Sequence, residues 1–471
     1  MRKTKIIATL GPATDSPEML GRLIDAGLNI FRLNMSHAPH DWTRRVVADI
    51  RAAATARQRT VGILMDTQGP AIRTGDLPVP LNLVPGERFT FTVRGETSEE
   101  TQSVNVNYAE FVDDIHEGDV VLVDNGAIHM KVLAKNGNRV ECEVLTAGKL
   151  GSRRHINLPG VKVSLPALTE KDIADVKLGL ELGVDYIALS FVREARDVRE
   201  LKKLIAKNAK SENLRPLIVA KIEDQEALKN LDAIVMDADA VMVARGDLGI
   251  EIPYEELPIV QRLIVKTCLR VGRPVIVATH MLESMIQSPM PTRAEVTDVA
   301  NAVFEQADAI MLSGETTVGR YPLKCIEVFD RIAQRTERSG GANYWEHADL
   351  IDPREKIAKS AVVMANELRA HALVVLIRSG SMTRTLSWLR PRHSFIYAFG
   401  PSQDVAEGLT LNWGVVPIVM PFDAHNLDQN IANALRTLLE KRLLRKGHTV
   451  VVVSSINAGD QVVDAVQMRV V

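Results

Sequence analysis

Charged and polar side chains stand where several short apolar runs of this sequence end. In residues 241–250, VMVARGDLGI, the run VMVA gives way to Arg245, Gly246 and Asp247. A buried strand gains nothing from these residues, because burying an unpaired charge is costly. A glycine lets the main chain come close to a ligand, since it has no side chain. The segment therefore indicates a site that uses a carboxylate and a close approach of the backbone.

A second carboxylate ends the preceding apolar run. Residues 216–223, PLIVAKIE, end in Lys221 and Glu223. If the two runs are neighbouring strands, Glu223 and Asp247 lie within reach of one divalent ion, and two carboxylates with otherwise open positions suit Mg²⁺. The sequence has no His or Cys cluster that would favour zinc. We therefore expect Mg²⁺, or Mn²⁺ in its place, at this pair.

Cations accompany the two carboxylates. Arg32 and Arg73 follow earlier apolar runs and, with Lys221, give three cationic side chains at strand ends. A metal beside several cations implies a multiply anionic substrate, most simply a phosphate ester. Singly, such residues are more often helix caps or solvated charges, so it is their repetition that indicates a site. The other polar residues at these ends are Asn34, Ser36, His37, Asp66, Thr67, Ser190, Thr279, Ser313 and Glu315.

The runs that must position these residues alternate with amphipathic, helix-like segments such as 16–27 and 169–183. Eight strand and helix units over this length predict a (β/α)8 TIM barrel, whose active site lies at the carboxyl ends of its strands. A doubly wound open sheet is the competing interpretation, but the near-equal repeats show no reversal and favour the barrel. The expected strands are 5–11, 28–37, 60–69, 184–192, 216–223, 238–249, 273–280 and 307–315.

The repeat is interrupted once and ends well before the chain does. Residues 70–165 show no convincing helix, and their short alternating runs, such as 88–95, 119–133 and 139–146, predict a small β-barrel domain inserted after strand 3. A linker-like stretch near Ser339 precedes further alternation, which predicts a C-terminal α/β domain. The expected domains are 1–69 and 166–340 for the barrel, 70–165 for the insert and 341–471 for the C-terminal domain.

The composition is that of an ordinary globular protein. Of 471 residues, 46% are hydrophobic and 25% are charged, with a net charge of -2, which argues against a general nucleic-acid or anionic-membrane binder. No apolar run reaches membrane-spanning length, and the N-terminal run is too short for a signal peptide. The cysteines Cys142, Cys268 and Cys325 form no CxxC pair, as expected of buried thiols in a reducing compartment. We therefore expect a cytoplasmic protein without a nucleic-acid or membrane partner.

Ten longer stretches carry a further indication. They are TKIIATLGPAT, FRLNMSH, MDTQGPAIRTGD, INLPGVKVSLPALTEKD, VDYIALSF, VAKIED, VMVARGDLGIEIP, VATHMLESMI, PMPTRAEVTDVANAV and IMLSGETTVGRYP. In this order, and with the insert where it stands, essentially the whole chain resembles the pyruvate kinase family. The resemblance implies a barrel domain, a mobile lid formed by the insert, a C-terminal effector domain and usually a homotetramer. It also implies the glycolytic transfer of the phosphoryl group of phosphoenolpyruvate to ADP, followed by protonation of the enolate to pyruvate.

The resemblance implies a role for each residue that matches the family pattern. Lys221 would contact the transferring phosphoryl group and the enolate, and Thr279 would lie beside the substrate and take part in proton delivery. Glu223 and Asp247 would hold Mg²⁺, and Gly246 would offer its backbone to the substrate carboxylate. Arg32 would bind phosphate oxygens, and substrate contacts would also come from Asp247 and Ser190.

Nucleotide and potassium sites follow from the same resemblance. The nucleotide would contact Asn34, His37, Arg73 and Arg154, the last standing where the family commonly has a lysine. K⁺ would be held by Asn34, Ser36, Asp66 and Thr67. Gln68 replaces a usual Lys, and Ala71 replaces a Glu associated with potassium-dependent members, so the K⁺ requirement stays open.

The C-terminal domain contains a segment similar to the phosphate-cradling loop of the family's effector site. In LIRSGSMTRT the candidate donors are Ser379, Ser381 and Thr383, although a polar turn of this kind is equally often a helix cap. The last segment, SSINAGDQVVDAVQMRVV, lacks the glycine- and threonine-rich loop of members regulated by fructose bisphosphate. We therefore do not expect regulation by that sugar.

Two other functions fit parts of the pattern. A metal-dependent lyase or aldolase acting on a pyruvate enolate would use a similar Glu and Asp pair, but it has no use for a lid, Arg73 or a nucleotide site. A non-catalytic metabolite sensor would be expected to have lost Lys221, Glu223 or Asp247, and all three are present. Saturable binding of ADP separates a kinase from a lyase, and any turnover excludes the sensor.

Overall fold

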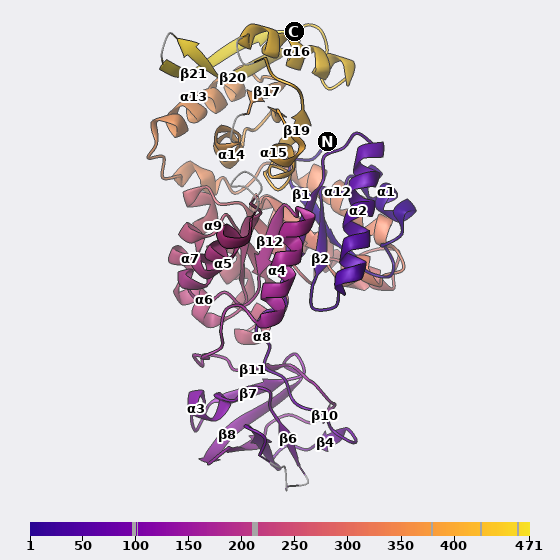
Figure 1. The fold of residues 1–471 in the computed structure, drawn as a ribbon, viewed down its shortest axis with the longest axis vertical. Coiled ribbons are helices and arrows are strands. Elements are labelled where there is room, and N and C mark those ends of the chain that lie inside the picture. Colours follow the sequence, from indigo (N-terminus) through magenta and orange to yellow (C-terminus); the bar gives the residue numbers. More distant parts are fainter. Residues whose placement is uncertain (97–99, 101, 210–214, 378–379, 424–425, 459–460) are drawn as a thin grey trace.

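The fold consists of a central barrel with a smaller domain at each end (Figure 1). The computed structural model describes residues 1–471 except 97–99, 101, 210–214, 378–379, 424–425 and 459–460, and over 455–458 and 461–463 it describes the backbone alone. In Figure 1 the insert lies at one end of the barrel and the C-terminal domain at the other. None of the helices in the described ranges is both long and apolar enough to cross a membrane.

Eight parallel strands close into a barrel, which confirms the predicted fold class and excludes the open sheet. The order around the barrel is β1-β16-β15-β14-β13-β12-β3-β2. The insert separates β3 from β12, as expected for an insertion after the third strand. The strands are β1 (Lys5–Thr9), β2 (Ile30–Asn34), β3 (Gly62–Asp66), β12 (Tyr186–Leu189), β13 (Leu217–Ile222), β14 (Ala240–Ala244), β15 (Val275–Ala278) and β16 (Ala309–Leu312).

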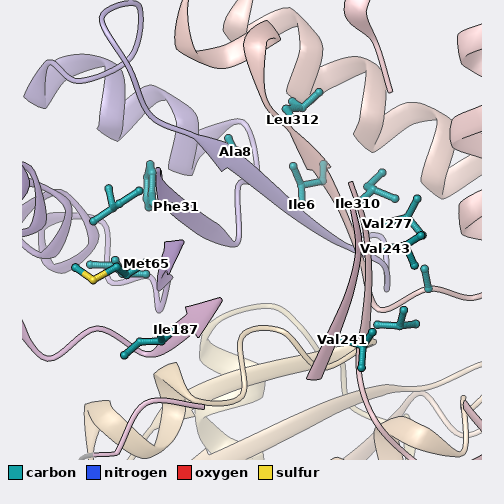
Figure 2. Close-up of a cluster of buried hydrophobic side chains, with 14 of the residues drawn as sticks. Ile6, Ala8, Phe31, Met65, Ile187, Val241, Val243, Val277, Ile310 and Leu312 are labelled. Carbon is teal, nitrogen blue, oxygen red and sulfur yellow. The ribbon is translucent and has the colours of Figure 1, made fainter. Parts of the chain in front are cut away.

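The barrel strands are apolar along nearly their whole length because both of their faces are covered. Alternate residues contribute to two separate clusters: Ile7 and Tyr186 belong to the cluster that fills the barrel, whereas Ile6, Ala8 and Phe31 pack in the cluster shared with the surrounding helices. Figure 2 shows side chains of this second cluster on successive strands. This packing fixes the strand ends on which the polar residues stand.

The helices around the barrel begin where the sequence signals predict. Ser16 caps α1, and Thr169 forms a capping box with Asp172 at the start of α4. The helices of this region mostly follow the barrel strands in the chain. They are α1 (Pro17–Asp25), α2 (His40–Ala56), α4 (Glu170–Leu182), α5 (Ala195–Asn208), α6 (Gln225–Lys229), α7 (Leu231–Asp237), α8 (Arg245–Glu251), α9 (Leu257–Val271), η2 (Glu283–Ile286), α10 (Arg293–Phe304), α11 (Gly314–Thr317), α12 (Pro322–Glu337) and η3 (Tyr344–His347).

The insert consists of a curled six-stranded β-sheet and a two-stranded sheet in which β4 and β10 pair antiparallel. Six strands pair in the order β11-β7-β8-β9-β5-β6, and isolated bridges from Arg73 to His155 and from Thr74 to Val106 link its two edges. The segment 119–133, read as one alternating run, is a hairpin of two strands, and a short helix, α3 (Phe111–Asp114), was not expected. The strands are β4 (Leu81–Leu83), β5 (Arg88–Thr92), β6 (Ser103–Asn105), β7 (Val120–Val123), β8 (Ile128–Asn136), β9 (Arg139–Val144), β10 (Gly148–Leu150) and β11 (Ile156–Asn157).

The C-terminal domain is the expected α/β unit. Its sheet has the order β19-β18-β17-β20-β21, and β21 runs antiparallel at the edge. A segment of this domain closes the amino end of the barrel, because Leu411 joins the barrel-filling cluster and Tyr186 Oη lies 3.1 Å from Thr410 Oγ1. The elements are α13 (Pro353–Glu367), β17 (Ala372–Leu376), α14 (Ser381–Trp388), β18 (Phe395–Gly400), α15 (Gln403–Glu407), β19 (Val415–Val419), α16 (Leu427–Glu440), β20 (Thr449–Ala458) and β21 (Gln461–Val470).

Candidate active site

Lys221 lies at the centre of a cluster of buried polar groups at the carboxyl end of the barrel. Its Nζ lies 2.9 Å from Glu223 Oε1 and 3.3 Å from Asp66 Oδ1, and it donates a hydrogen bond of 2.8 Å to Ser190 Oγ. Lys221 and Glu223 are two residues apart along one extended segment, so both side chains point to the same side. The three groups around Lys221 come from the ends of β3, β12 and β13.

Asp66 connects this lysine to Arg32. Arg32 Nε donates to Asp66 Oδ2 at 2.7 Å, and its Nη1 donates to Thr9 Oγ1 at 2.8 Å. Asp66 also accepts a hydrogen bond of 3.2 Å from Ser190 Oγ. A buried carboxylate therefore holds two of the three predicted cations side by side.

The buried charges shift one another's proton affinities. Burial alone would raise the pKa of Asp66, but Lys221 and Arg32 outweigh it and hold that pKa below its usual value. Burial lowers the pKa of Lys221, but Asp66 and Glu223 outweigh it and raise that pKa above its usual value. Lys221 therefore remains an ammonium ion at neutral pH.

Glu223 is a buried carboxylate with an incompletely satisfied oxygen. Its Oε2 accepts a hydrogen bond of 2.5 Å from the Phe191 amide. Its Oε1 has no partner with hydrogen-bond geometry, although Lys221 Nζ is 2.9 Å away. Burial is the main cause that raises the pKa of Glu223, and the charge of Asp247 raises it further. A cation beside Oε1 would satisfy the oxygen and relieve the repulsion between the two carboxylates.

Asp247 lies in the first turn of α8, directly after β14, at the end of the barrel that faces the insert (Figure 1). Within the described ranges, no group of three or more His, Cys, Asp or Glu side chains is arranged to hold a metal ion. Mg²⁺ commonly takes one or two protein carboxylates and completes its shell with water and substrate oxygens. The donor set of Glu223 and Asp247 fits that ion.

Thr279 is held against Gly246. The Gly246 amide donates a hydrogen bond of 2.7 Å to Thr279 Oγ1, and the Thr279 hydroxyl donates to the Ala278 carbonyl at 2.6 Å. The backbone of Thr279 has φ 69°, a left-handed conformation that a β-branched residue rarely adopts. The predicted backbone donor and the predicted proton-delivery residue are therefore direct neighbours.

The predicted potassium ligands lie around the ends of β2 and β3. Asn34 pairs with Asp66 across these strands, and the Ser36 amide donates to Asn34 Oδ1 at 3.2 Å. Thr67 Oγ1 accepts a hydrogen bond of 3.1 Å from the Ser190 amide. The structure thus brings the four predicted residues to one side of the cluster.

A cleft of about 780 Å³ opens beside Arg32. It is lined by Asn34 and His37, two of the predicted nucleotide contacts, and also by Trp42, which sequence reasoning missed. Trp42 is held in place because its Nε1 donates to Asp15 Oδ2 at 2.8 Å. The sequence signal that could have identified Trp42 as part of this cleft is its position five residues after His37.

The other two nucleotide candidates belong to the insert. Arg73 Nη1 donates to the Arg153 carbonyl at 3.2 Å, and Arg154 Nη1 donates to Asp124 Oδ1 at 3.2 Å. Both hydrogen bonds lie within the insert. Both arginines stand on the domain that faces the barrel's carboxyl end.

Sequence reasoning also missed the contact that joins insert and barrel. Asn157 Nδ2 donates to Glu251 Oε1 at 3.0 Å, and both residues are buried. The ring of His155 lies 6.1 Å from that of Phe191, centre to centre. These residues line a cavity of about 350 Å³ that also reaches Glu223. A contact between residues so far apart in sequence leaves no local pattern.

The predicted effector segment is described only in part. Ser379 lies outside the described residues. Ser381 begins α14, and Thr383 in its first turn is fully buried with an Oγ1 that has no hydrogen-bond partner. Ser454, in the middle of β20 of the same domain, also has a buried hydroxyl without a hydrogen-bond partner.

The chain is similar to known proteins along its whole length. The family model "Pyruvate kinase, barrel domain" matches residues 1–326, and "Pyruvate kinase, alpha/beta domain" matches residues 355–468. Plastidial pyruvate kinase 2 of Arabidopsis thaliana is 43% identical over 464 residues, which cover 96% of this chain and 78% of that protein. The pyruvate kinase of Geobacillus stearothermophilus is 39% identical over 471 residues, covering 98% and 78%. A crystal structure of a pyruvate kinase from Cryptosporidium parvum superposes with a TM-score of 0.93 at 35% identity and covers 100% of this chain and 96% of that one.

Proposed function

The chain belongs to the pyruvate kinase family, and from that premise we propose how its own residues carry out the reaction. It is a phosphotransferase that transfers the phosphoryl group of phosphoenolpyruvate to ADP and forms pyruvate and ATP in glycolysis. The match to both domains over nearly the whole chain sets aside the lyase and the sensor. The proposal concerns the roles of individual residues.

Glu223 and Asp247 hold the divalent metal, Mg²⁺ or Mn²⁺. The observation that carries this assignment is the buried Glu223 carboxylate, whose Oε1 contacts Lys221 Nζ at 2.9 Å without hydrogen-bond geometry and whose pKa is raised by burial and by the charge of Asp247. When bound, the metal neutralises charge on the substrate oxygens. The two carboxylates would hold the metal from the end of β13 and from the first turn of α8.

Lys221 and Arg32 bind the phosphoryl group. Phosphoryl transfer depends mainly on positioning and on neutralising charge. Asp66 holds both cations in place before the substrate arrives, so little reorganisation is needed. Lys221 also faces the oxygen of the enolate that remains after transfer, and Ser190 Oγ keeps its ammonium group oriented.

The carboxylate and the enolate carbon of the substrate are served by Gly246, Asp247 and Thr279. The first turn of α8 offers the Asp247 N–H to the substrate carboxylate, and Gly246, which has no side chain, lets that carboxylate come close. The Gly246 amide also fixes Thr279 Oγ1 at 2.7 Å, and the Thr279 hydroxyl takes part in delivering a proton to the enolate carbon. The hydroxyl regains a proton from water, so the residue ends the cycle unchanged.

ADP lies between barrel and insert. Asn34 and His37 line the cleft of about 780 Å³ beside Arg32, a position suited to the nucleotide. Arg73 and Arg154 on the insert add positive charge for its phosphates. The insert acts as a lid in this proposal, because two nucleotide contacts are on each side of the opening.

Potassium binds near Asn34, Ser36, Asp66 and Thr67. Support comes from the pairing of Asn34 with Asp66 and from the buried carboxylate that Asp66 contributes. Gln68 and Ala71 leave the requirement for this ion to be measured. Activity that needs K⁺ supports the site, whereas activity independent of K⁺ removes it.

The remaining proposals concern regulation and assembly. A phosphate-bearing effector binds at the start of α14, where the unpartnered hydroxyl of Thr383 supports a polar ligand. The domains divide at residues 69/70, 165/166 and 340/341, and the chain forms a homotetramer. We propose a cytoplasmic location, although relatives include plastidial and bacterial proteins.

Titration with Mn²⁺, followed by electron paramagnetic resonance, tests the metal assignment. Glu223→Gln and Asp247→Asn should each abolish tight Mn²⁺ binding and activity. Glu226→Gln is the matched control, because Glu226 follows three residues later and pairs with Lys162 on the surface. Unchanged Mn²⁺ affinity in both active-site variants would contradict the assignment.

A further inference from the structure

The strained end of β15 requires an explanation. Thr279 and His280 both have left-handed backbones, with φ 69° and 52°. A residue with a branched side chain remains in that region only when its surroundings force it there, and such strain tends to be retained at functional positions. The structure should therefore contain a group that holds this segment.

That group is the side chain of Arg245. Its Nη2 donates to the Thr279 carbonyl at 2.6 Å, and its Nε lies 3.2 Å from the same oxygen and 3.3 Å from the Ala278 carbonyl. Nη2 also reaches the His280 carbonyl at 3.5 Å. One planar guanidinium thus contacts three consecutive carbonyl oxygens, and those of Thr279 and His280 belong to the strained residues.

The side chain of Arg245 is in turn held by helices α9 and α10. Its Nη1 donates to Asp298 Oδ1 on α10 at 2.7 Å and to Gln261 Oε1 on α9 at 3.3 Å. Gln261 Nε2 in turn donates to Glu305 Oε2 at 2.9 Å. The guanidinium is buried and its donors are engaged by protein groups, so Arg245 is not a substrate-binding cation, although its position in the sequence suggested the rim of the site.

Gly246 provides a second contact that fixes Thr279. Gly246 follows Arg245 directly, and its amide donates to Thr279 Oγ1. The dipeptide therefore fixes Thr279 twice, at its carbonyl through the arginine side chain and at its hydroxyl oxygen through the glycine amide. The oxygen stays in place while its proton turns between the Ala278 carbonyl and a ligand.

We propose that Arg245 is a positioning residue that places the Thr279 hydroxyl for protonation of the enolate, a proposal that rests on the role assigned to Thr279 above. Arg245 acts through Thr279 and touches no reacting atom. A displacement of about 1 Å at a reacting group can cost about 10²-fold in rate, so loss of the guanidinium should lower turnover without weakening substrate binding in proportion.

The test is a double-mutant cycle of Arg245→Met and Thr279→Val, with Arg270→Met as the control for the same substitution at an exposed arginine. For each variant, kcat, KM for phosphoenolpyruvate and thermal stability are measured. A second assay follows exchange of the pyruvate methyl protons with deuterium from solvent, which reports the proton step without net phosphoryl transfer. Asp298 is left partly exposed by Arg245→Met, so no unpaired charge is buried there.

Arg245→Met and Thr279→Val should each lower kcat and methyl exchange by about 10²-fold with little change in KM, and the double variant should be no worse than the poorer single one. Additive losses would overturn the proposal for Arg245 alone. Normal exchange in Thr279→Val would overturn the role of Thr279 and this proposal with it. If Arg245→Met lowers only the melting temperature, Arg245 is merely structural and the proposal fails.

Arg245→Lys keeps the test decisive if the Met variant does not fold. Lysine retains the charge beside Asp298 but loses the planar group that spans the three carbonyls. Exchange and kcat should then fall between those of the parent and Thr279→Val at unchanged KM. Full activity in Arg245→Lys would contradict the need for the guanidinium.

Discussion

Replacement of Lys221 by Met tests the centre of the site. The variant keeps a side chain of similar length but removes the ammonium group that lies 2.9 Å from Glu223 and 3.3 Å from Asp66. Removing one well-placed electrostatic group from an active site costs about 10²–10³ in kcat, or about 2.7–4 kcal/mol. Since Lys221 serves both the phosphoryl group and the enolate, we expect a loss of about 10³-fold or more.

The same substitution has a calculable effect on stability. Breaking a buried ion pair costs about 3–5 kcal/mol when one charge is left without a partner. Asp66 keeps Arg32 at 2.7 Å, so the loss falls mainly on Glu223, whose Oε1 loses the ammonium group at 2.9 Å. We therefore expect Lys221→Met to melt earlier than the parent without metal and to recover when Mg²⁺ is added.

The assay combines steady-state kinetics, Mn²⁺ titration and thermal melts with and without Mg²⁺. Lys177→Met is the control, because Lys177 is an exposed lysine on α4. We expect the Lys221 variant to fold and bind Mn²⁺ while phosphoryl transfer is lost. Near-normal turnover would refute the role of Lys221, and a destabilisation that Mg²⁺ does not reverse would refute the placement of the metal beside Glu223.

Three further outcomes are expected. Burial and the neighbouring Asp185 raise the pKa of Glu407 from 4.5 to about 8. The stabilising effect of the protonated Glu407 carboxyl is therefore complete below pH 4.5 and is lost as the pH rises through 8. In pH-dependent melts, Glu407→Gln should flatten this decline in stability, and an unchanged slope would contradict the role of Glu407. Addition of ADP should change the fluorescence of Trp42, and the signal should disappear in Trp42→Phe; a signal that persists would place the nucleotide elsewhere. Asn157→Leu removes the hydrogen bond to Glu251 and should raise KM for ADP more than KM for phosphoenolpyruvate, whereas equal changes would argue against a lid that carries nucleotide contacts.

The barrel could be predicted because its signals are local. Each strand is mostly an apolar run, and helix starts such as Ser16 and Thr169 carry their capping residues. Lys221 and Glu223 could be placed together because residues two apart on a strand share a side. Asp247 could be added because neighbouring strands end at the same rim.

The unpredicted features depend on contacts between distant segments. β21 is an edge strand with a weak alternating pattern, and its identity comes from antiparallel pairing with β20. Arg245 precedes Asp247 by two residues in the sequence. Its side chain nevertheless does not bind substrate, because it donates hydrogen bonds to Asp298 and to the Thr279 carbonyl after β15. The contact of Asn157 with Glu251 joins two domains and likewise leaves no periodic signal.

The most direct test of the account is ³¹P nuclear magnetic resonance of phosphoenolpyruvate incubated with the chain, ADP and Mg²⁺, with and without K⁺. The account predicts that the phosphoenolpyruvate signal falls as the γ-phosphate signal of ATP grows by the same amount, only when ADP and Mg²⁺ are both present, and that Lys221→Met abolishes both changes. Release of inorganic phosphate without ATP, or transfer that continues in Lys221→Met, would contradict it.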